Sequence, residues 1–254
     1  MQKPHFIMTG STSGLGFALA QAMLQDCCEL TLIVRDINKA RAYFSNQNVH
    51  LIECDLSNIQ QVREINHQFN PDIQYDGLIH CAGLGYFKSL LEHEDAEVVE
   101  TYQINIVYFA ILLKRCAPFF KAHASVVGIS SLAAFATQPY AAHYGGSKAA
   151  LNHLLNALRM EQPNWHVMTV NVGPIQTPFH GKADPSGQYA HQVKRIMLQP
   201  EFVATQIIKA MKQKKIEVNL PKGLHLMLKW YQLAPRWIEK FAKPLFLGKK
   251  RKGF

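Results

Sequence analysis

The 254-residue chain is 48% apolar and 10% aromatic, which is enough to bury the core of one large domain and excludes a fibrous or disordered protein. Its net charge of +9 is concentrated in residues 220–254, where nine Lys and Arg residues stand against one Glu (9 − 1 = +8), so a nucleic-acid-binding surface on the nearly neutral body is disfavoured. Five scattered cysteines and twelve histidines match neither a disulfide framework nor the spacing of metal ligands, so we expect no metal.

The first predicted unit is a strand, HFIMT (5–9), followed by a glycine-rich turn and a helix, FALAQAMLQ (17–25). The turn reads Thr9-Gly10-Ser11-Thr-Ser-Gly14-Leu15-Gly16. In this context backbone amides and a helix amino terminus can hold a pyrophosphate. The residues before the strand do not form a signal peptide, and no run of eighteen apolar residues occurs, so we expect a cytoplasmic protein without a membrane-spanning helix.

The second strand, LTLIV (30–34), is followed by Arg35 and by a predicted helix with Asp36 near its start. In a dinucleotide-binding unit this strand end meets the adenosine ribose, where an acid selects a free 2′-hydroxyl and an arginine accepts a 2′-phosphate. Arg35 therefore favours NADP over NAD. The alternative is that Arg35 only caps a solvated turn and that Asp36 binds the ribose.

Strands and helices continue to alternate up to residue 220. This alternation, with nearly continuous apolar strands, predicts a doubly wound, Rossmann-type parallel sheet with helices on both faces and ligands beyond the carboxyl ends of the strands. We expect residues 1–220 to form this catalytic unit and 221–254 a basic tail extending it. The predicted elements are a strand over 49–56, a helix over 57–69 capped by Ser57, a strand over 76–83, a helical pair over 92–121, a strand at Val126, a helix carrying Tyr144, a strand over 166–173, a helix over 201–213 and a strand over 215–220.

The stretch from Ser131 to Lys148 contains the residues that can do chemistry. Tyr144 and Lys148 are four residues apart, which places them on one helix face, and a cation beside a phenol favours the phenolate and lowers the phenol pKa. The preceding buried strand, SVVGIS, delivers Ser130 and Ser131 at its carboxyl end, where a hydroxyl can bond a substrate oxygen. On its own, a tyrosine and a lysine at this spacing also occur on exposed helix faces by chance.

Taken together, these segments resemble the short-chain dehydrogenase/reductase family, in its short single-domain form, over residues 4–220. The order and spacing of the matching positions make the resemblance specific. Those positions are Thr9 to Gly16, Asp55, Ala82, Gly83, Asn105, Ser131, Tyr144, Lys148, Gly173, Pro174, Ile175 and Thr177.

The resemblance implies a role for each catalytic position. Tyr144 is expected to be the general acid in reduction, and Lys148 to lower its pKa and bind the nicotinamide ribose. Ser131 is expected to polarise the carbonyl, with Ser130 the less favoured serine. Asn105 is expected to anchor a water joining Lys148 to solvent, unless it is only satisfied by neighbouring backbone.

The resemblance also implies the cofactor contacts. The phosphates are expected to bind the glycine turn, and adenine to contact Asp55 and Leu56. The riboses are expected beside Ala82 and Gly83, and the nicotinamide carboxamide at the segment that begins with Pro174. The expected contacts are Gly10, Ser11, Gly14, Leu15, Gly16, Arg35, Asp55, Leu56, Ala82, Gly83, Tyr144, Lys148, Pro174, Ile175 and Thr177. One departure is visible, because the fourth strand ends His80-Cys81-Ala82-Gly83 where the family usually has Asn-Asn-Ala-Gly, so the hydrogen bonds of an asparagine are lost.

Two further regions bear on substrate and partners. Residues 178–200 suit a mobile lid, where Phe179, Tyr189 and Met197 either line an apolar pocket or pack. Tyr140 is a rival phenol that we expect to line the pocket or pack. In the tail, Lys222, Lys229, Arg236, Lys240 and Lys243 would fall within an arc of about 60° of one helix, beside apolar residues, with Pro235 and Pro244 bending or breaking it.

A basic stripe beside aromatic residues, with a terminal Lys-Lys-Arg-Lys, is typical of a helix that lies on an anionic membrane surface. The alternatives are a helix that covers the substrate cleft or a partner subunit, and a site for an acidic protein. We therefore expect an NADPH-dependent reductase of an apolar or lipid-like carbonyl substrate, which assembles as a homodimer or homotetramer. The other hypotheses are a reductase of carrier-bound 3-oxoacyl chains and a non-catalytic NADP-binding sensor or membrane scaffold.

Overall fold

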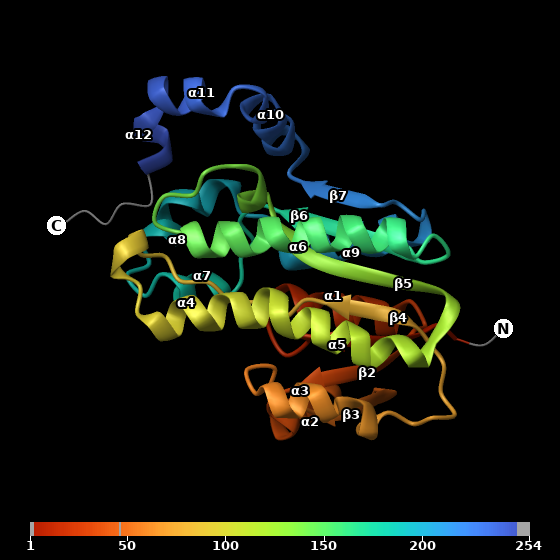
Figure 1. Cartoon of the computed structure of the whole chain (residues 1–254). Coiled ribbons are helices and arrows are strands. Elements are labelled where there is room, and N and C mark those ends of the chain that lie inside the picture. The colour runs from red at the N-terminus through yellow and green to blue at the C-terminus, as the bar shows by residue number, and fades with distance from the viewer. Residues whose placement is uncertain (1–2, 46, 248–254) are drawn as a thin grey trace.

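The computed structural model describes residues 3–45 and 47–247, and its centre is one seven-stranded sheet (Figure 1). All neighbouring strands are parallel, in the order β3-β2-β1-β4-β5-β6-β7. The order reverses between β1 and β4, which is the position where such sheets bind ligands. The strands are β1 (His5–Thr9), β2 (Glu29–Val34), β3 (Val49–Glu53), β4 (Tyr75–His80), β5 (Phe120–Ser131), β6 (His166–Val172) and β7 (Glu217–Leu220).

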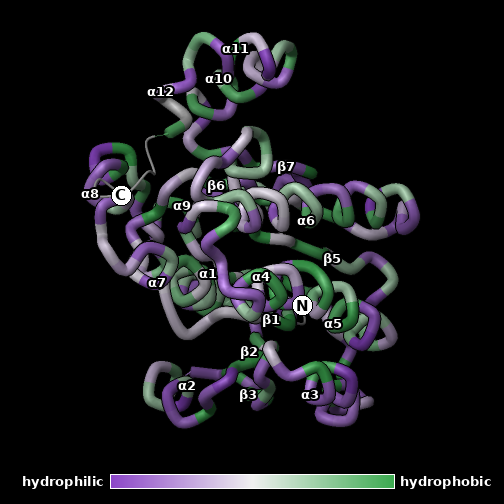
Figure 2. The backbone as a smooth tube through the Cα atoms, turned by 60° about the vertical axis from the view of Figure 1, so that its left-hand side comes forward, coloured by the Kyte–Doolittle hydropathy of each residue, from purple (hydrophilic) through white to green (hydrophobic). Residues whose placement is uncertain are grey.

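Helices cover both faces of the sheet, as the alternating pattern predicted. Parallel strands are buried on both faces, which explains why nearly every strand is an apolar run. Figure 2 shows these apolar strands running through the middle of the molecule. The helices are α1 (Gly14–Gln25), α2 (Ile37–Phe44), α3 (Ile59–Glu64), α4 (Asp95–Tyr102), α5 (Tyr108–Cys116), α6 (Ala142–Glu161), α7 (Phe179–Ala183), α8 (Gln188–Val193), α9 (Pro200–Lys212), α10 (Lys222–Leu233), α11 (Pro235–Phe241) and α12 (Lys243–Phe246).

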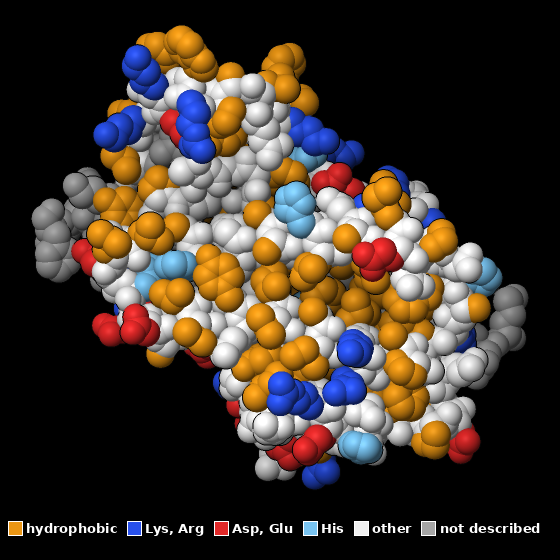
Figure 3. Space-filling view, viewed as in Figure 1, with side chains coloured by type: hydrophobic (Ala, Val, Ile, Leu, Met, Phe, Trp, Pro, Cys, Tyr) orange, Lys and Arg blue, Asp and Glu red, His pale blue; other side chains and the backbone are white. Residues whose placement is uncertain are grey.

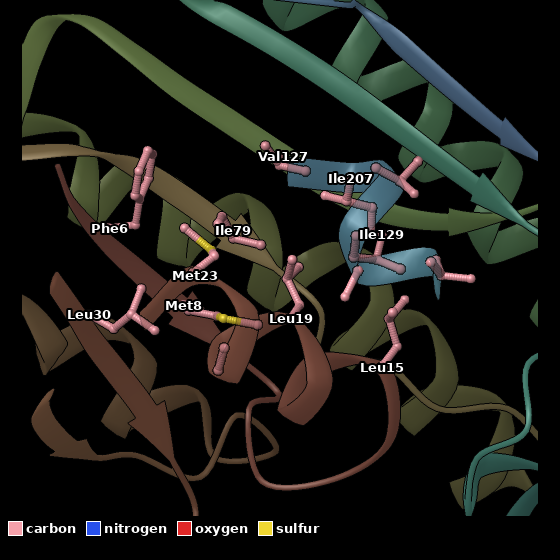
Figure 4. Close-up of a cluster of buried hydrophobic side chains, with 14 of the residues drawn as sticks. Phe6, Met8, Leu15, Leu19, Met23, Leu30, Ile79, Val127, Ile129 and Ile207 are labelled. Atoms are coloured by element: carbon pink, nitrogen blue, oxygen red, sulfur yellow. The ribbon is translucent and has the colours of Figure 1, made fainter. Parts of the chain in front are cut away.

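Each face of the sheet has its own core cluster. Leu15 and Leu19 of α1 and Ile207 of α9 pack on Met8 and Ile129 on one face (Figure 4). The opposite cluster joins side chains of α3, α5 and α6, including Val62, Phe109, Leu112, Leu151 and Leu155, to the other side of the strands. The two clusters fix α1 and α6, whose amino-terminal ends both lie beside the site described below.

Two sequence predictions about helices were wrong in detail. Helix α3 is capped by Asn58, whose Oδ1 accepts hydrogen bonds from the amides of Gln60 and Gln61. Ser57 instead donates from its amide and its hydroxyl to Asp55 Oδ1, so it belongs to the preceding turn. The predicted helical pair over 92–121 is one helical run, in which a π-helical turn, Gln103–Val107, joins α4 to α5.

This run, Asp95–Phe119, is long and apolar enough to cross a membrane by length and composition alone, a test that a core helix also passes, so the expectation of no membrane-spanning helix stays a prediction. In the fold it lies along one face of the sheet, with Phe109, Leu112 and Cys116 in the core. Its outer side carries the exposed side chains of Val99 and Val107. Assembly as a homodimer or homotetramer stays a prediction.

The tail is three short helices that stand beyond β7 (Figure 1). The chain leaves α10 at Ala234, whose φ of −147° and ψ of 59° are not helical, and Pro235 starts α11. The break expected at Pro235 is therefore confirmed. It also makes the predicted 60° arc of five cations wrong, because that arc assumed one continuous helix. The terminal Lys-Lys-Arg-Lys lies outside the described residues.

Candidate active site

A cavity of about 400 Å³ opens beyond the carboxyl ends of β1, β4, β5 and β6. One part is lined by the glycine turn after β1 and by the segment after β6, and the other part by aromatic and leucine side chains. Most of the expected site residues line it, namely Gly10, Gly14, Leu15, Gly16, Ala82, Gly83, Ser131, Tyr144, Lys148, Pro174, Ile175 and Thr177. Among the described residues no group of three or more His, Cys, Asp or Glu side chains could hold a metal ion.

The turn after β1 has the shape of a phosphate cradle. Gly10 has a φ of +71°, and a side chain there would lie 2.6 Å from the amide of Ala82. A Cβ at Gly16 would lie 2.1 Å from Gly10 O, so only glycine lets α1 start this close to the turn. Ser11 Oγ is buried and has no hydrogen-bond partner in residues 3–45 and 47–247, and Ser13 does not cap α1 with its side chain. An unpaired hydroxyl and open helix amides suit the pyrophosphate of a dinucleotide.

Thr9 supports the neighbouring turn after β4, where the sequence departs from the usual Asn-Asn-Ala-Gly. Its Oγ1 accepts hydrogen bonds from the amides of Cys81 and Ala82, each at 3.2 Å, and lies 3.0 Å from His80 Nδ1. With two bonds accepted, the hydroxyl proton can be donated to Nδ1. Burial lowers the pKa of His80 to about 3, and Lys148 adds to the shift, so this imidazole is neutral at physiological pH. Thr9 therefore holds the backbone of this turn beside the cavity.

Ser131 and Tyr144 meet where β5 and α6 come together. Ser131 Oγ accepts a hydrogen bond from Ala133 N at 3.1 Å and donates to Val172 O at 3.3 Å. Burial raises the pKa of Tyr144, and a hydrogen bond with Ser131 opposes this shift. Burial is the larger of these two effects, and the expected lowering of this pKa by Lys148 stays a prediction. The phenol is protonated at neutral pH, which is the form that can donate a proton.

Lys148 lies beside the Tyr144 ring within α6. Its Nζ lies 6.0 Å from the centre of the Tyr144 ring and donates a hydrogen bond to Ile129 O at 2.9 Å, instead of bonding the phenol. Burial lowers the pKa of Lys148 to about 8. A Cβ on Gly83 would lie 3.1 Å from Nζ, so the glycine gives the amine close access to the backbone beside the cavity.

Asn105 lies in the π-helical turn and is fully buried. Its Oδ1 accepts from Leu84 N at 2.9 Å, and its Nδ2 donates to Leu84 O at 2.8 Å and to Ser147 Oγ at 2.9 Å. Asn105 thus ties the loop after β4 to α6 beside Lys148. These bonds match the simpler of the two sequence interpretations, while the water chain stays a prediction.

Comparison with known proteins agrees with this geometry. The family model described as short chain dehydrogenase matches residues 4–187. The chain belongs to the short-chain dehydrogenase family. It is 26% identical to a probable short-chain type dehydrogenase/reductase, VdlC, of Helicobacter pylori, over 96% of this chain and 98% of that protein.

Two solved structures share the fold of this short-chain dehydrogenase. A short-chain dehydrogenase from Sphingobium yanoikuyae in complex with NADPH matches with a TM-score of 0.77 and 19% identity, over 98% of this chain and 96% of that one. A short chain dehydrogenase/reductase from Burkholderia phymatum in complex with NAD matches with a TM-score of 0.81 and 18% identity, over 93% and 95%. The two neighbours thus hold different dinucleotides.

Four expected cofactor residues do not line the cavity of this short-chain dehydrogenase. Ser11 is buried beneath the glycine turn, and Arg35 is exposed after β2. Asp55 and Leu56 are half-buried after β3, where Asp55 Oδ1 accepts hydrogen bonds from Ser57. Asp36 caps α2, because its Oδ1 accepts from Lys39 N at 2.9 Å. One oxygen of the Asp36 carboxylate is therefore bonded to the start of α2.

The other end of the cavity is made of apolar side chains, several of which the sequence did not reveal. The Phe87 ring lies 4.9 Å from that of Tyr189 and 6.1 Å from that of Tyr144, and Phe179 lies 5.4 Å from Tyr144. Phe87 was missed, and the only signal was an aromatic residue four positions after the Ala82-Gly83 turn. Of the three residues that the sequence analysis placed either in the pocket lining or in packing, Phe179 and Tyr189 line the cavity, whereas Met197 does not.

Leu224 and Leu228, from the inner side of α10, were also missed as cavity residues, although their spacing of four marks one helix face. The tail therefore covers part of the cleft, which was one of the alternatives to a helix on a membrane surface. Of the two rival hydroxyl residues, Ser130 also lines the cavity, but its Oγ donates a hydrogen bond to Lys148 O at 3.1 Å. Tyr140 precedes α6 and does not line the cavity.

Proposed function

We propose that this protein is an NADPH-dependent reductase of apolar ketones or aldehydes. The observation that carries the proposal is the position of Ser131, Tyr144 and Lys148, which lie between the glycine turn and the aromatic end of a single cavity. A carbonyl group between the two ends would be within reach of both hydroxyls.

The reaction would consume one carbonyl, one NADPH and one proton, and would yield an alcohol and NADP⁺. NADPH, when bound along Gly10, Gly14, Gly16 and Thr177, supplies the hydride. Tyr144 supplies the proton, since burial keeps its phenol protonated. The Ser131 hydroxyl bonds the same carbonyl oxygen and stabilises the negative charge that develops there.

Lys148 would act as a positioning group near neutral pH. Its pKa of about 8 leaves the ammonium mostly charged at pH 7, and a buried positive charge favours the loss of a proton from the nearby phenol during the reaction. As pH rises through 8 this charge is lost, so reduction should slow on the alkaline side.

The choice of NADPH rests on the end of β2. Arg35 is exposed and forms no salt bridge within residues 3–45 and 47–247, so its guanidinium is available to a 2′-phosphate. Asp36, the residue that would favour NAD, is held by the amide of Lys39.

The apolar end of the cavity supports an apolar substrate. Phe87, Phe179, Tyr189, Leu224 and Leu228 offer ring faces and methyl groups to whatever is attached to the carbonyl. A pocket of this kind selects mainly by shape and burial, with a few polar side chains, Gln138, His180 and Lys182, beside the apolar ones.

The test is NADPH oxidation over a panel of ketones, aldehydes and 3-oxoacyl esters, free and carrier-bound. Tyr144→Phe should lower kcat by roughly 10²- to 10⁴-fold on any substrate found. The matched control, Tyr140→Phe, removes a phenol outside the cavity and should retain activity.

Undiminished turnover by Tyr144→Phe would refute the proposal. Activity only on carrier-bound chains, lost on removal of the residues after Leu220, would identify a carrier-dependent reductase instead. Tight NADPH binding without turnover across the whole panel would identify a sensor.

A further inference from the structure

The outer side of the tail carries large apolar side chains in water. On α10 and α11, Leu226, Met227, Trp230, Leu233, Trp237 and Phe241 are between 59% and 75% exposed, and we call these six residues the tail patch. Figure 3 shows apolar side chains projecting at the upper edge of the molecule, over α10 and α11, with Lys and Arg side chains beside them. Exposed patches of this kind mark binding surfaces.

The patch is not a consequence of a loosely attached helix. The inner side of α10 packs on the body through Tyr231, which is 7% exposed, and through the cavity residues Leu224 and Leu228. At about 100° per residue, the four patch residues of α10 fall within an arc of about 120° on the other side of the helix. The helix therefore has two apolar sides, of which only one is covered.

Hydrogen bonds fix α11 to the body as well. Glu239 accepts from the Tyr231 hydroxyl at 2.5 Å, from the Thr137 hydroxyl and from Arg236 at 2.7 Å. Thr137 N in turn donates to the Tyr231 oxygen at 3.2 Å. These donors, that of Thr137 first, lower the pKa of Glu239 to about 2, so the carboxylate stays charged and bonded at physiological pH. The tail patch is thus presented by a fixed support.

The charges around the patch indicate what covers it. Lys222, Lys229, Arg236, Lys240 and Lys243 are exposed on the three tail helices, and Glu239 is the single acid between them, so residues 222–243 carry 5 − 1 = +4. The phase of α10 places Lys222 and Lys229 at one margin of the apolar arc. A second copy of the chain would bring the same positive charge against this one, which disfavours self-association through the patch.

We propose that the tail patch docks on an anionic lipid bilayer. Tryptophan and leucine side chains enter the boundary between headgroups and acyl chains, and the surrounding cations meet the anionic headgroups. The sequence beyond the described residues adds Lys249, Lys250, Arg251 and Lys252.

Docking would also place the cavity close to the lipid. Leu224 and Leu228 line the cavity from the same helix that carries the patch, so one helix thickness, about 10 Å, separates the two. If the proposed reductase function holds, this position suits apolar carbonyl substrates that partition into bilayers.

The test is sedimentation of the full-length protein with vesicles of phosphatidylcholine alone and with 30% phosphatidylglycerol, a readout that needs no substrate. The protein should bind the anionic vesicles, and binding should weaken in high salt. The triple variant Trp230→Ser, Trp237→Ser, Phe241→Ser should bind at least tenfold more weakly. The matched control replaces exposed apolar residues elsewhere, Leu91→Ser, Met160→Ser and Phe202→Ser, and should bind like the native protein.

Thermal melting shows that each variant is folded, since all six replaced side chains are exposed. Failure of the native protein to bind anionic vesicles would overturn the proposal, and so would equal binding by the two triple variants. An oligomer that dissociates on the patch substitutions, without vesicle binding, would show that a second copy covers the patch. Absence of reductase activity would leave the vesicle result standing, so the two proposals fail separately.

Discussion

The two ends of the cavity are built from different parts of the chain. The end with the glycine turn is made mainly of backbone, where Gly10, Gly14 and Gly16 allow amides and a helix start to approach a ligand. The other end is made of side chains, from the loop after β4, from α7 and α8 and from the tail helix α10. A backbone surface suits a ligand whose phosphates are always the same, whereas a side-chain surface can be changed one residue at a time. We therefore expect cofactor and substrate binding to respond to different substitutions.

Among the expected changes in ligand binding, the largest is at the backbone end of the cavity. In Gly16→Ala, the added Cβ would lie 2.1 Å from Gly10 O, which is too close for two non-bonded atoms, so the turn must move. NADPH binding should weaken by roughly 100-fold, the upper end of what overpacking costs. Fluorescence titration of NADPH measures this. Gly181→Ala, where nothing lies within 4 Å, is the control, and equal losses in the two variants would contradict the distinction.

The second prediction concerns Arg35, the side chain that is proposed to select NADPH over NADH. Arg35→Ala should raise the Kd of NADPH by roughly 10- to 100-fold, because charge-assisted bonds to the 2′-phosphate are lost, and should leave that of NADH unchanged. Arg63→Ala, on exposed α3, should change neither. An unchanged ratio of the two affinities in Arg35→Ala would reject the assignment.

The smallest effect is expected at the apolar end. Phe87→Leu keeps an apolar side chain of smaller volume and removes the ring contacts with Tyr189 and Tyr144, so the KM for an apolar ketone should rise by roughly 2- to 10-fold. The Kd of NADPH should not change. Steady-state kinetics measures the KM of the ketone, and fluorescence titration measures the Kd of NADPH. Phe202→Leu, at an exposed position, is the control. Weaker NADPH binding in Phe87→Leu would show that the two ends are coupled.

The same contrast explains what could be predicted from the sequence. The sheet and the glycine turn were predictable because parallel strands and phosphate cradles need particular residues at close spacing, as in Thr9 to Gly16. Ser131, Tyr144 and Lys148 were placed correctly beside the cavity because a strand end and a helix face fix where they lie.

Other features depend on contacts between segments that are far apart in the chain, and residue spacing in the sequence does not reveal such contacts. Phe87 lines the site only because α7 and α8 fold over it, and Leu224 does so because α10 packs across the cavity opening. The pKa of Tyr144 depends on how much the ring is buried, and the cap of α3 depends on which of two adjacent polar residues faces the helix. The break at Ala234 redistributes the tail cations, which a single helical wheel could not show.

The π-helical turn at Gln103–Val107 has a consequence for changes in the length of this chain. Such a turn contains one residue more than an α-helical turn, and removing one residue would turn everything before it by about 100° around the helix axis. Thr101 would leave the interior, or Asn105 would lose Leu84 and Ser147. Deletion of one residue within Gln103–Val107 should therefore disrupt the buried contacts of this helix, whereas a length change around Gly187, where a Cβ would meet nothing within 4 Å, should be tolerated.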